Sequence, residues 1–236
     1  MPKTKAFESN TDSYEAWFEA HQAAYESELR AVRELWPAVA DSMEIGVGAG
    51  HFAGPLGIKT AIEPAAAIRK AAAKRGIHAV NGVAEHLPFP EARFDAVLMV
   101  TVLCFVDDPE RAVREMYRVL RPGGCAVVGI LDRQSDLGQE YERGRSSNVF
   151  YQDARFFSTM DVHALLSESG FVDLESRQTI FRSPDVIQVP DPVEPGYGKG
   201  VFVVIRGWKP PHVPPTNSGG RTGERKEHAP APVARA

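Results

Sequence analysis

The stretch Glu44-Ile45-Gly46-Val47-Gly48-Ala49-Gly50 places three glycines at alternate positions, and Glu63 follows it at the distance of one helix and one strand. Glycine carries no side chain, so a ligand can approach the backbone of such a turn and bind its N–H groups. An acidic residue that ends the next strand can accept hydrogen bonds from a ribose. Together the two features predict a nucleoside-binding crevice.

Two classes of cofactor use such a loop. Nicotinamide and flavin enzymes need Gly-x-Gly-x-x-Gly, whose third glycine lets a helix pack over a pyrophosphate, but His51 stands at that third position here. The carboxylate of Glu44 would repel a pyrophosphate and attract a cation. S-adenosylmethionine carries an ammonium group and a sulfonium and no phosphate, so the pattern favours this cofactor. A turn of an α/β fold that binds no ligand is the remaining alternative.

Composition and charge narrow the class of protein. A chain of 236 residues suits one α/β domain with appendages. A net charge of −4 with mixed signs predicts no nucleic-acid partner. Cys104 and Cys125 are the only cysteines, too few for a disulfide framework or a four-cysteine zinc site, and we predict no metal. The N-terminus lacks the apolar core of a signal peptide, and the longest apolar run, Ala96 to Val106, is too short to span a bilayer. We expect a soluble cytoplasmic protein without a membrane partner, either a monomer or a homodimer.

Alternating strand and helix patterns predict a doubly wound sheet. The expected strands lie at 43–46, 59–63, 77–81, 94–100, 125–131, 171–180 and 200–208. The expected helices lie at 14–35, 65–75, 109–120 and 158–169, with a short or irregular one near Pro55 and a proline-rich excursion at 183–195. Residues 133–153 are polar and show no clean period. Residues 209–236 are rich in proline, glycine and charge, which predicts a disordered tail outside the fold.

Four blocks of sequence follow one another in an order that is specific to one family. They are the glycine loop 44–50, Ala61-Ile62-Glu63-Pro64, the segment 82–89 closed by Phe94-Asp95, and Arg118-Val119-Leu120-Arg121-Pro122-Gly123-Gly124. In these blocks the chain resembles the class I S-adenosylmethionine-dependent methyltransferases, within the small-molecule group that contains ubiquinone-biosynthesis enzymes. The resemblance covers roughly residues 43–208. It implies a Rossmann-like, seven-stranded sheet whose last strand is antiparallel.

The resemblance also implies a set of residues that bind S-adenosylmethionine. Glu44 would orient the loop or the ammonium group, the loop backbone would approach the methionine, and Glu63 would accept both ribose hydroxyls. Many relatives have an aspartate that binds the adenine amino group where this chain has Val83, so the adenine contact is left to the backbone or side chains of the next two residues. The full expected set is Glu44, Gly46, Val47, Gly48, Glu63, Pro64, Ala84, Glu85 and Thr101.

Methyl transfer is an in-line displacement at a carbon that the sulfonium already activates. Positioning of the acceptor can therefore carry much of the rate, and a general base is needed only if the acceptor loses a proton. Neighbouring positions Tyr14, Trp17, Phe18 and His21 on the first helix predict a lid with an aromatic acceptor pocket, although the same stripe would also suit a helix simply packed on the domain. His21 and Asp132 are the candidate bases.

The sequence thus predicts S-adenosylmethionine-dependent methyl transfer to a small molecule. It divides the chain into an N-terminal helical lid (1–40), a methyltransferase domain (41–208) with an acceptor-side insertion (133–157), and the tail. A non-catalytic cofactor-binding or scaffold protein is an alternative, and a nicotinamide oxidoreductase is disfavoured by His51 and Glu44. A protein acceptor ranks lower than a small molecule, because one helix and one insertion suggest an enclosed pocket.

Overall fold

Three apolar strands form the centre of the sheet: β1 (Ser42–Ile45), β4 (Phe94–Val100) and β5 (Leu120–Leu131). Their side chains are buried on both faces along most of their length, as expected for strands that helices cover from two sides. The computed structural model describes residues 3–211. Strand β5 begins earlier than predicted, because it takes in the Arg121–Gly124 turn, where Gly123 adopts a φ of 81°.

The strand order is β3-β2-β1-β4-β5-β8-β6-β7. The remaining strands are β2 (Thr60–Ile62), β3 (His78–Val80), β6 (Val172–Thr179), β7 (Glu194–Pro195) and β8 (Phe202–Trp208). Strands β1 to β5 are parallel, and β8 lies between β5 and β6 and is antiparallel to both. The expected Rossmann-like sheet with an antiparallel last strand is confirmed. The proline-rich excursion adds one short edge strand, β7, which pairs with β6.

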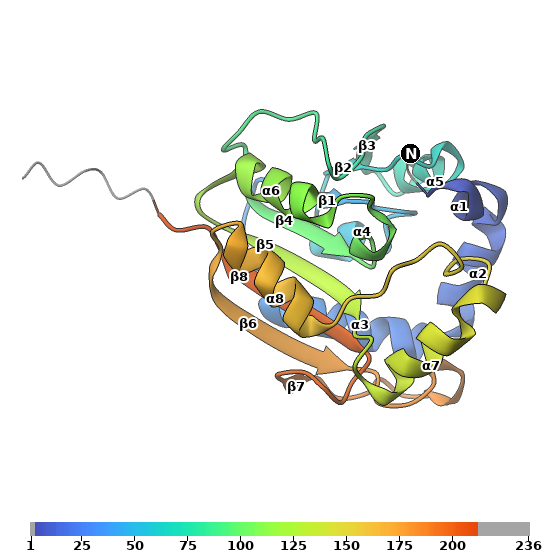
Figure 1. Ribbon diagram of the computed structural model, residues 1–236. Helices are drawn as coiled ribbons and strands as arrows, with labels where there is room; N and C mark the ends of the chain where they lie inside the picture. Colours follow the sequence, from blue (N-terminus) through green and yellow to red (C-terminus); the bar gives the residue numbers. More distant parts are fainter. Residues whose placement is uncertain (1–2, 212–236) are drawn as a thin grey trace, which may run out of the picture.

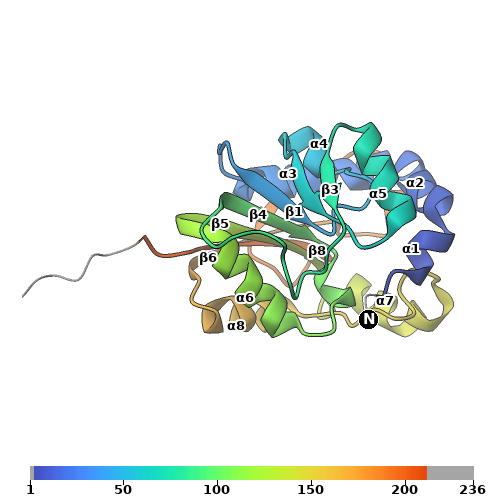
Figure 2. The same cartoon turned by 90° about the horizontal axis from the view of Figure 1, so that it is seen from above.

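Helices cover the sheet in two layers, and a third group lies at one edge (Figure 1). One face carries α6 (Pro109–Val119) and α8 (Thr159–Glu168), and the other carries α3 (Gln22–Leu35), α4 (Ala53–Leu56) and α5 (Ala66–Lys74). Figure 2 shows α1 (Lys5–Ser9), α2 (Thr11–Ala20) and α7 (Asp136–Gly144) together at the edge where the parallel strands end. Three short 3-10 helices complete the described chain: η1 (Leu103–Phe105), η2 (Arg145–Ser147) and η3 (Pro184–Val186).

The N-terminal helical segment differs from the single helix predicted at 14–35. The helix breaks at His21, whose φ of −118° and ψ of 42° separate α2 from α3. The ring Nδ1 of His21 lies 2.9 Å from the carbonyl oxygen of Trp17, the same oxygen that accepts the His21 backbone N–H. The ring and the backbone N–H of His21 thus share one partner, the carbonyl oxygen of Trp17 in the last turn of α2. A break of this kind turns the first two helices away from α3 and over the edge of the sheet.

The acceptor-side insertion contains a helix that periodicity did not predict. Helix α7 begins after Ser135, whose Oγ accepts a hydrogen bond from the Gly138 backbone N–H at 3.0 Å. This serine is a local N-cap signal in an otherwise polar stretch. The predicted start of α6 is correct, since the Asp108 carboxylate accepts from the Arg111 backbone N–H at 2.9 Å.

The fold continues one residue beyond the predicted boundary at 208. The Lys209 backbone N–H donates to the Gly124 carbonyl at 2.8 Å, and its Nζ donates to the carbonyls of Tyr117 and Leu120 at 2.8 and 2.7 Å. Lys209 therefore belongs to the domain and not to the tail. The rest of the predicted tail, from 212 to 236, lies outside the described residues.

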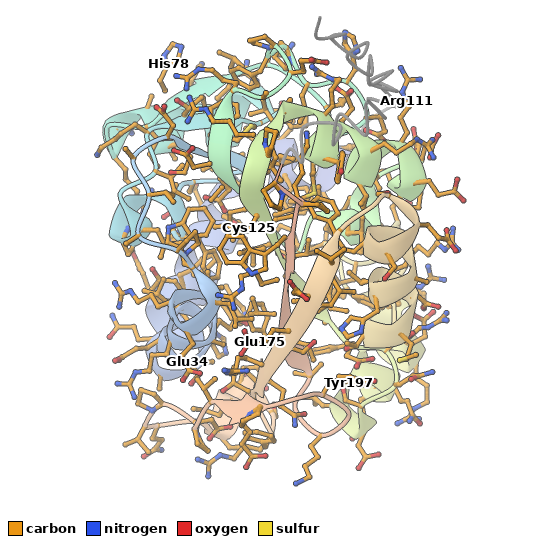
Figure 3. All side chains as sticks on the ribbon, turned by 90° about the vertical axis from the view of Figure 1, so that its left-hand side faces the viewer. Glu34, His78, Arg111, Cys125, Glu175 and Tyr197 are labelled. Carbon is orange, nitrogen blue, oxygen red and sulfur yellow. The ribbon has the colours of Figure 1, made fainter. Side chains whose placement is uncertain are left out.

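The opposite end of the sheet, away from α1 and α2, faces the viewer in Figure 3. Arg177 on β6 forms ion pairs with Glu34 on α3, at 2.9 Å, and with Glu175, at 2.7 Å; both of these glutamates are labelled in Figure 3. These contacts fasten α3 to the antiparallel part of the sheet. No helix within residues 3–211 is long and apolar enough to cross a membrane.

Candidate active site

A cavity of ≈ 820 Å³ lies at the ends of the parallel strands, beside the point between β1 and β4 where the strand order reverses. Open α/β sheets bind ligands at this position. Its walls come from the turns after β1, β2, β3 and β4, from Leu131 at the end of β5, and from the helices α1 and α2. The volume is near the upper end of the ~300–1,000 Å³ range typical of small-molecule sites, so it has room for a cofactor and a small acceptor side by side.

The glycine loop forms the floor of this cavity in a conformation that glycine adopts easily. Gly46, Gly48 and Gly50 have φ angles of 65°, 52° and 90°, a region that strains other residues. A Cβ on Gly46 would lie 2.3 Å from Cγ2 of Val102, and one on Gly48 would lie 2.6 Å from the hydroxyl of Tyr14. The loop therefore requires its glycines both for its backbone angles and for the close approach of neighbouring side chains.

Glu63, directly after β2, holds the glycine loop from below. Its Oε2 accepts the Gly48 backbone N–H at 2.9 Å, and its Oε1 accepts the Ala65 backbone N–H at 2.8 Å. Burial to 7 % exposure raises the pKa of Glu63, while these two hydrogen bonds act in the opposite direction. Each carboxylate oxygen can accept more than one hydrogen bond. The group is thus fixed in place with acceptor capacity left for hydroxyls in the cavity.

Glu44 is the second buried carboxylate of the cavity. It is 2 % exposed, and burial raises its pKa well above the ordinary value, assisted by the charge of Glu63 and opposed by a hydrogen bond from the Ala53 backbone. Its Oε2 has no hydrogen-bond partner among the described residues. A buried acceptor without a donor costs free energy. This orphaned oxygen fits the ammonium group of a cationic cofactor, which would supply the missing donor.

The other residues of the predicted cofactor set surround the same space. All nine of them line the cavity: Glu44, Gly46, Val47, Gly48, Glu63, Pro64, Ala84, Glu85 and Thr101. Glu85 accepts the backbone N–H groups of Asp107 and Asp108 at 2.8 and 3.3 Å, which joins the turn after β3 to the turn before α6. Thr101 has a φ of 53° at the end of β4. Such strain in a residue other than glycine occurs often at functional sites.

The predicted acceptor residues separate into two groups. Tyr14, Trp17 and Phe18 line the cavity from α2, but His21 does not. The His21 ring stacks on Trp17, and its Nε2 lies 3.0 Å from Oδ1 of Asp185, on an exposed carboxylate. The ring therefore has partners outside the cavity lining.

Asp132, the other candidate base, also lies outside the cavity lining. It is buried to 1 % exposure directly after β5. Its Oδ2 accepts the Thr159 hydroxyl at 2.7 Å, and its Oδ1 accepts the Gln134 backbone N–H at 2.9 Å. These contacts join the end of β5 to the start of α8.

Beyond the predicted residues, the cavity lining includes Glu28 on α3, which sequence reasoning missed, and Tyr141 and Tyr151, which lie in the predicted acceptor-side insertion. Burial raises the pKa of Glu28 to about 8. The signal for Glu28 was present in the sequence, because it stands three residues after Tyr25 and four before Val32, inside the apolar stripe of its helix. An acidic side chain in such a stripe faces the protein, not the solvent.

The first two helices both cover the cavity and pack on the domain. The Phe18 ring stacks on His51 with centroids 3.7 Å apart, and Glu15 pairs with Arg75 at 2.9 Å. Glu8 on α1 accepts the backbone N–H groups of Ala66 and Ala67 at the start of α5, where the N-cap residue provides no side-chain cap of its own. The aromatic stripe of α2 therefore lines the cavity and packs on the domain at the same time.

Other chemistries find little support in the described part of the chain. No three His, Cys, Asp or Glu side chains within residues 3–211 gather as metal ligands. Burial raises the pKa of Cys104 and of Cys125 to about 12, so both thiols stay protonated at neutral pH.

Comparisons with known proteins agree with this geometry. Residues 43–128 match the family model of the methyltransferase domain. A solved S-adenosylmethionine-dependent methyltransferase of Thermotoga maritima, described as a possible histamine N-methyltransferase, is 48% identical, with a TM-score of 0.85 over 87% of this chain and 99% of that chain. An uncharacterised protein of Methanocaldococcus jannaschii is 39% identical over 199 residues, 84% of this chain and 96% of its own length. A segment of 52 residues, 22% of the chain, is 44% identical to the ubiquinone/menaquinone biosynthesis C-methyltransferase UbiE of Vibrio cholerae.

The chain belongs to the class I S-adenosylmethionine-dependent methyltransferases. It is therefore an enzyme of the methyltransferase class, and S-adenosylmethionine is its methyl donor. The alternatives of a nicotinamide oxidoreductase and of a non-catalytic scaffold are set aside on this finding. The residues around the cavity fit the donor, because a cationic ligand would supply a partner for the orphaned oxygen of Glu44.

Proposed function

We propose that the protein transfers the methyl group of S-adenosylmethionine to a small-molecule acceptor that lies in the same cavity. The observation that carries this proposal is the covered cavity of ≈ 820 Å³ at the ends of the parallel strands. Helices α1 and α2 and the segment that follows α7 contribute to its walls. A cavity that is covered in this way admits a small molecule more readily than it admits the surface of another protein.

The order of the strands supports two separate ends of the cavity. One end is lined by residues after β1, β2 and β3, such as Glu44, Glu63 and Ala84, and takes the cofactor. The other end is lined by Leu131 at the end of β5, Ile180 after β6 and Val201 before β8. Because β4 and β5 separate β1 from β8 in the sheet, the two ends lie side by side and do not overlap. We assign the second end to the acceptor.

The chain's own residues would act by binding and positioning. When bound, S-adenosylmethionine supplies a methyl carbon that its sulfonium makes reactive. Glu63 would accept the ribose hydroxyls, and Glu44 would accept the ammonium group. The backbone N–H groups of the glycine loop would hold the methionine, and α2 would exclude water from above. No covalent nucleophile is required for an in-line displacement, in keeping with the two protonated thiols.

The relative from Thermotoga maritima adds support for a small acceptor. The acceptor named in its description, histamine, is a small amine, and that protein is covered by this chain over 99% of its length. The likeness to UbiE covers 22% of this chain and carries no argument about the acceptor. The oligomeric state, monomer or homodimer, stays a prediction.

Two measurements test the proposed function. Calorimetric titration is expected to show binding of S-adenosylmethionine and none of NAD(H). Incubation with methyl-labelled S-adenosylmethionine and a cell extract is expected to place the label in the small-molecule fraction. Label in the protein fraction alone would contradict a small acceptor. Absence of S-adenosylmethionine binding would contradict the cofactor end of the site.

A further inference from the structure

Glu28 is a carboxylate inside the acceptor end of the cavity that the mechanism so far leaves without a task. It lies on α3 one turn before Val32, on the side of the helix that borders the cavity. Protein atoms surround it, yet it keeps accessible surface because it borders the cavity. Within residues 3–211 it has no hydrogen bond and no ion pair, and burial alone displaces its pKa. A folded protein rarely keeps such a group without a use.

Aromatic side chains, not cations, surround Glu28. Tyr14, Phe18, Tyr141 and Tyr151 line the same cavity. The negative charge of Glu28 contributes to the raised pKa of each of the three tyrosines. Among the described residues that line the cavity, Lys3 is the lysine and Arg111 is the arginine. Neither contributes to the pKa of Glu28, so neither neutralises it.

We propose that the acceptor is an amine, and that Glu28 binds its nitrogen and takes the proton that this nitrogen must lose. This inference rests on the proposed function and deepens it. An anionic group between aromatic rings is the arrangement that proteins use to bind organic cations. An acidic acceptor would instead need a positive group beside it. When ionised, the three carboxylates Glu28, Glu44 and Glu63 would attract both cationic partners.

The chemistry of the step follows from this placement. An ammonium ion has no free lone pair, so the amine first gives a proton to Glu28. The lone pair of the nitrogen then attacks the methyl carbon, a new N–C bond forms, and the electrons of the broken C–S bond stay on sulfur as a neutral thioether. The product is a methylated ammonium ion, and Glu28 releases its proton to solvent. A carboxyl group that exchanges protons near pH 8 suits this role, because a general base works best near the operating pH.

Binding to the complex with S-adenosylhomocysteine tests the inference directly. The probes are three amines (histamine, phenethylamine and butylamine), with phenol and benzoate as neutral and acidic counterparts. We expect at least one amine to bind, and neither phenol nor benzoate. In Glu28→Gln, which keeps the shape of the side chain, we expect amine binding to weaken about tenfold or more. Methylation of that amine should slow by about 100-fold or more, with unchanged affinity for S-adenosylmethionine.

Two further variants separate a role in proton transfer from a structural one. Glu28→Asp keeps the carboxylate and should recover part of the amine binding that Glu28→Gln loses. Glu26→Gln alters an exposed residue of the same helix, which pairs with Arg30 at 2.5 Å, and should leave binding and transfer unchanged. Full methyl transfer by Glu28→Gln overturns the inference, as does a wild-type complex that binds none of the amines. Failure to bind S-adenosylhomocysteine would instead contradict the proposed function.

Discussion

Glu63→Ala is expected to weaken S-adenosylmethionine binding by about 1.5–3 kcal/mol, the range for a hydrogen bond to a charged group, or about 10- to 150-fold in Kd. The substitution removes the acceptor assigned to the ribose hydroxyls. It also frees the backbone N–H groups of Gly48 and Ala65, which the carboxylate now holds at 2.9 and 2.8 Å. The loop would then lose both its ligand contact and its support. Calorimetric titration measures the first loss, and thermal unfolding of the free protein measures the second.

Glu63→Gln provides the matched control for this experiment. The amide keeps one oxygen that can accept the Ala65 or the Gly48 backbone N–H, so the loop should stay closer to its native arrangement. The substitution removes the negative charge of Glu63. We therefore expect an affinity for S-adenosylmethionine between those of the wild type and Glu63→Ala. Unchanged affinity in a folded Glu63→Ala protein would remove Glu63 from the cofactor site.

Glu44→Gln is expected to stabilise the free protein and to weaken cofactor binding. Glu44 is buried with an oxygen that lacks a donor. Loss of a buried, unsatisfied charge should add about 1–3 kcal/mol to the free energy of unfolding at neutral pH. The same change removes the partner assigned to the ammonium group, so the affinity for S-adenosylmethionine should fall by about tenfold or more. A gain in stability joined to a loss of binding is typical of a site that stores strain for its ligand.

The pH dependence of this variant has a definite sign. Burial raises the pKa of Glu44 in the folded state above its ordinary value of 4.5. Between pH 4.5 and the folded-state pKa, the unfolded chain therefore binds fewer protons than the folded chain. The stability of the wild type must fall as pH rises through this range, and the penalty disappears below the unfolded-state pKa. The difference between Glu44→Gln and wild type should therefore be small near pH 4 and grow toward neutral pH. Glu28 acts in the same direction in both proteins, so the difference reports Glu44 together with its interaction with Glu63.

Urea unfolding of the free proteins over a series of pH values measures this difference. A difference that stays constant with pH would mean that the Glu44 carboxylate ionises normally in the folded protein. Equal or tighter binding of S-adenosylmethionine by Glu44→Gln would remove the ammonium contact from the account.

The cofactor end of the cavity was predictable from sequence because its determinants are local. Glycines at alternate positions fix the loop, and one strand and one helix fix the distance to Glu63. Parallel strands bring the turns that follow them to one edge, so Ala84 and Thr101 arrive at the same cavity without any further information. The antiparallel position of β8 came from the family resemblance and not from periodicity.

The acceptor end depends on contacts that a sequence pattern does not contain. The hydrogen bond of Asp132 with the hydroxyl of Thr159, which is remote in sequence, could not be read from the pattern that made this carboxylate a candidate base. His21 broke the helix that was expected to carry it into the pocket. Glu28 was visible as a charge in an apolar stripe, but only the tertiary structure places that stripe beside the cavity.

A crystal structure of the protein with S-adenosylhomocysteine tests the central claim most directly. The account predicts both ribose hydroxyls within hydrogen-bond distance of the Glu63 carboxylate, and the ammonium group beside the oxygen of Glu44 that now lacks a partner. Electron density that places the nucleoside away from Glu63, or outside the cavity beneath α2, would contradict it.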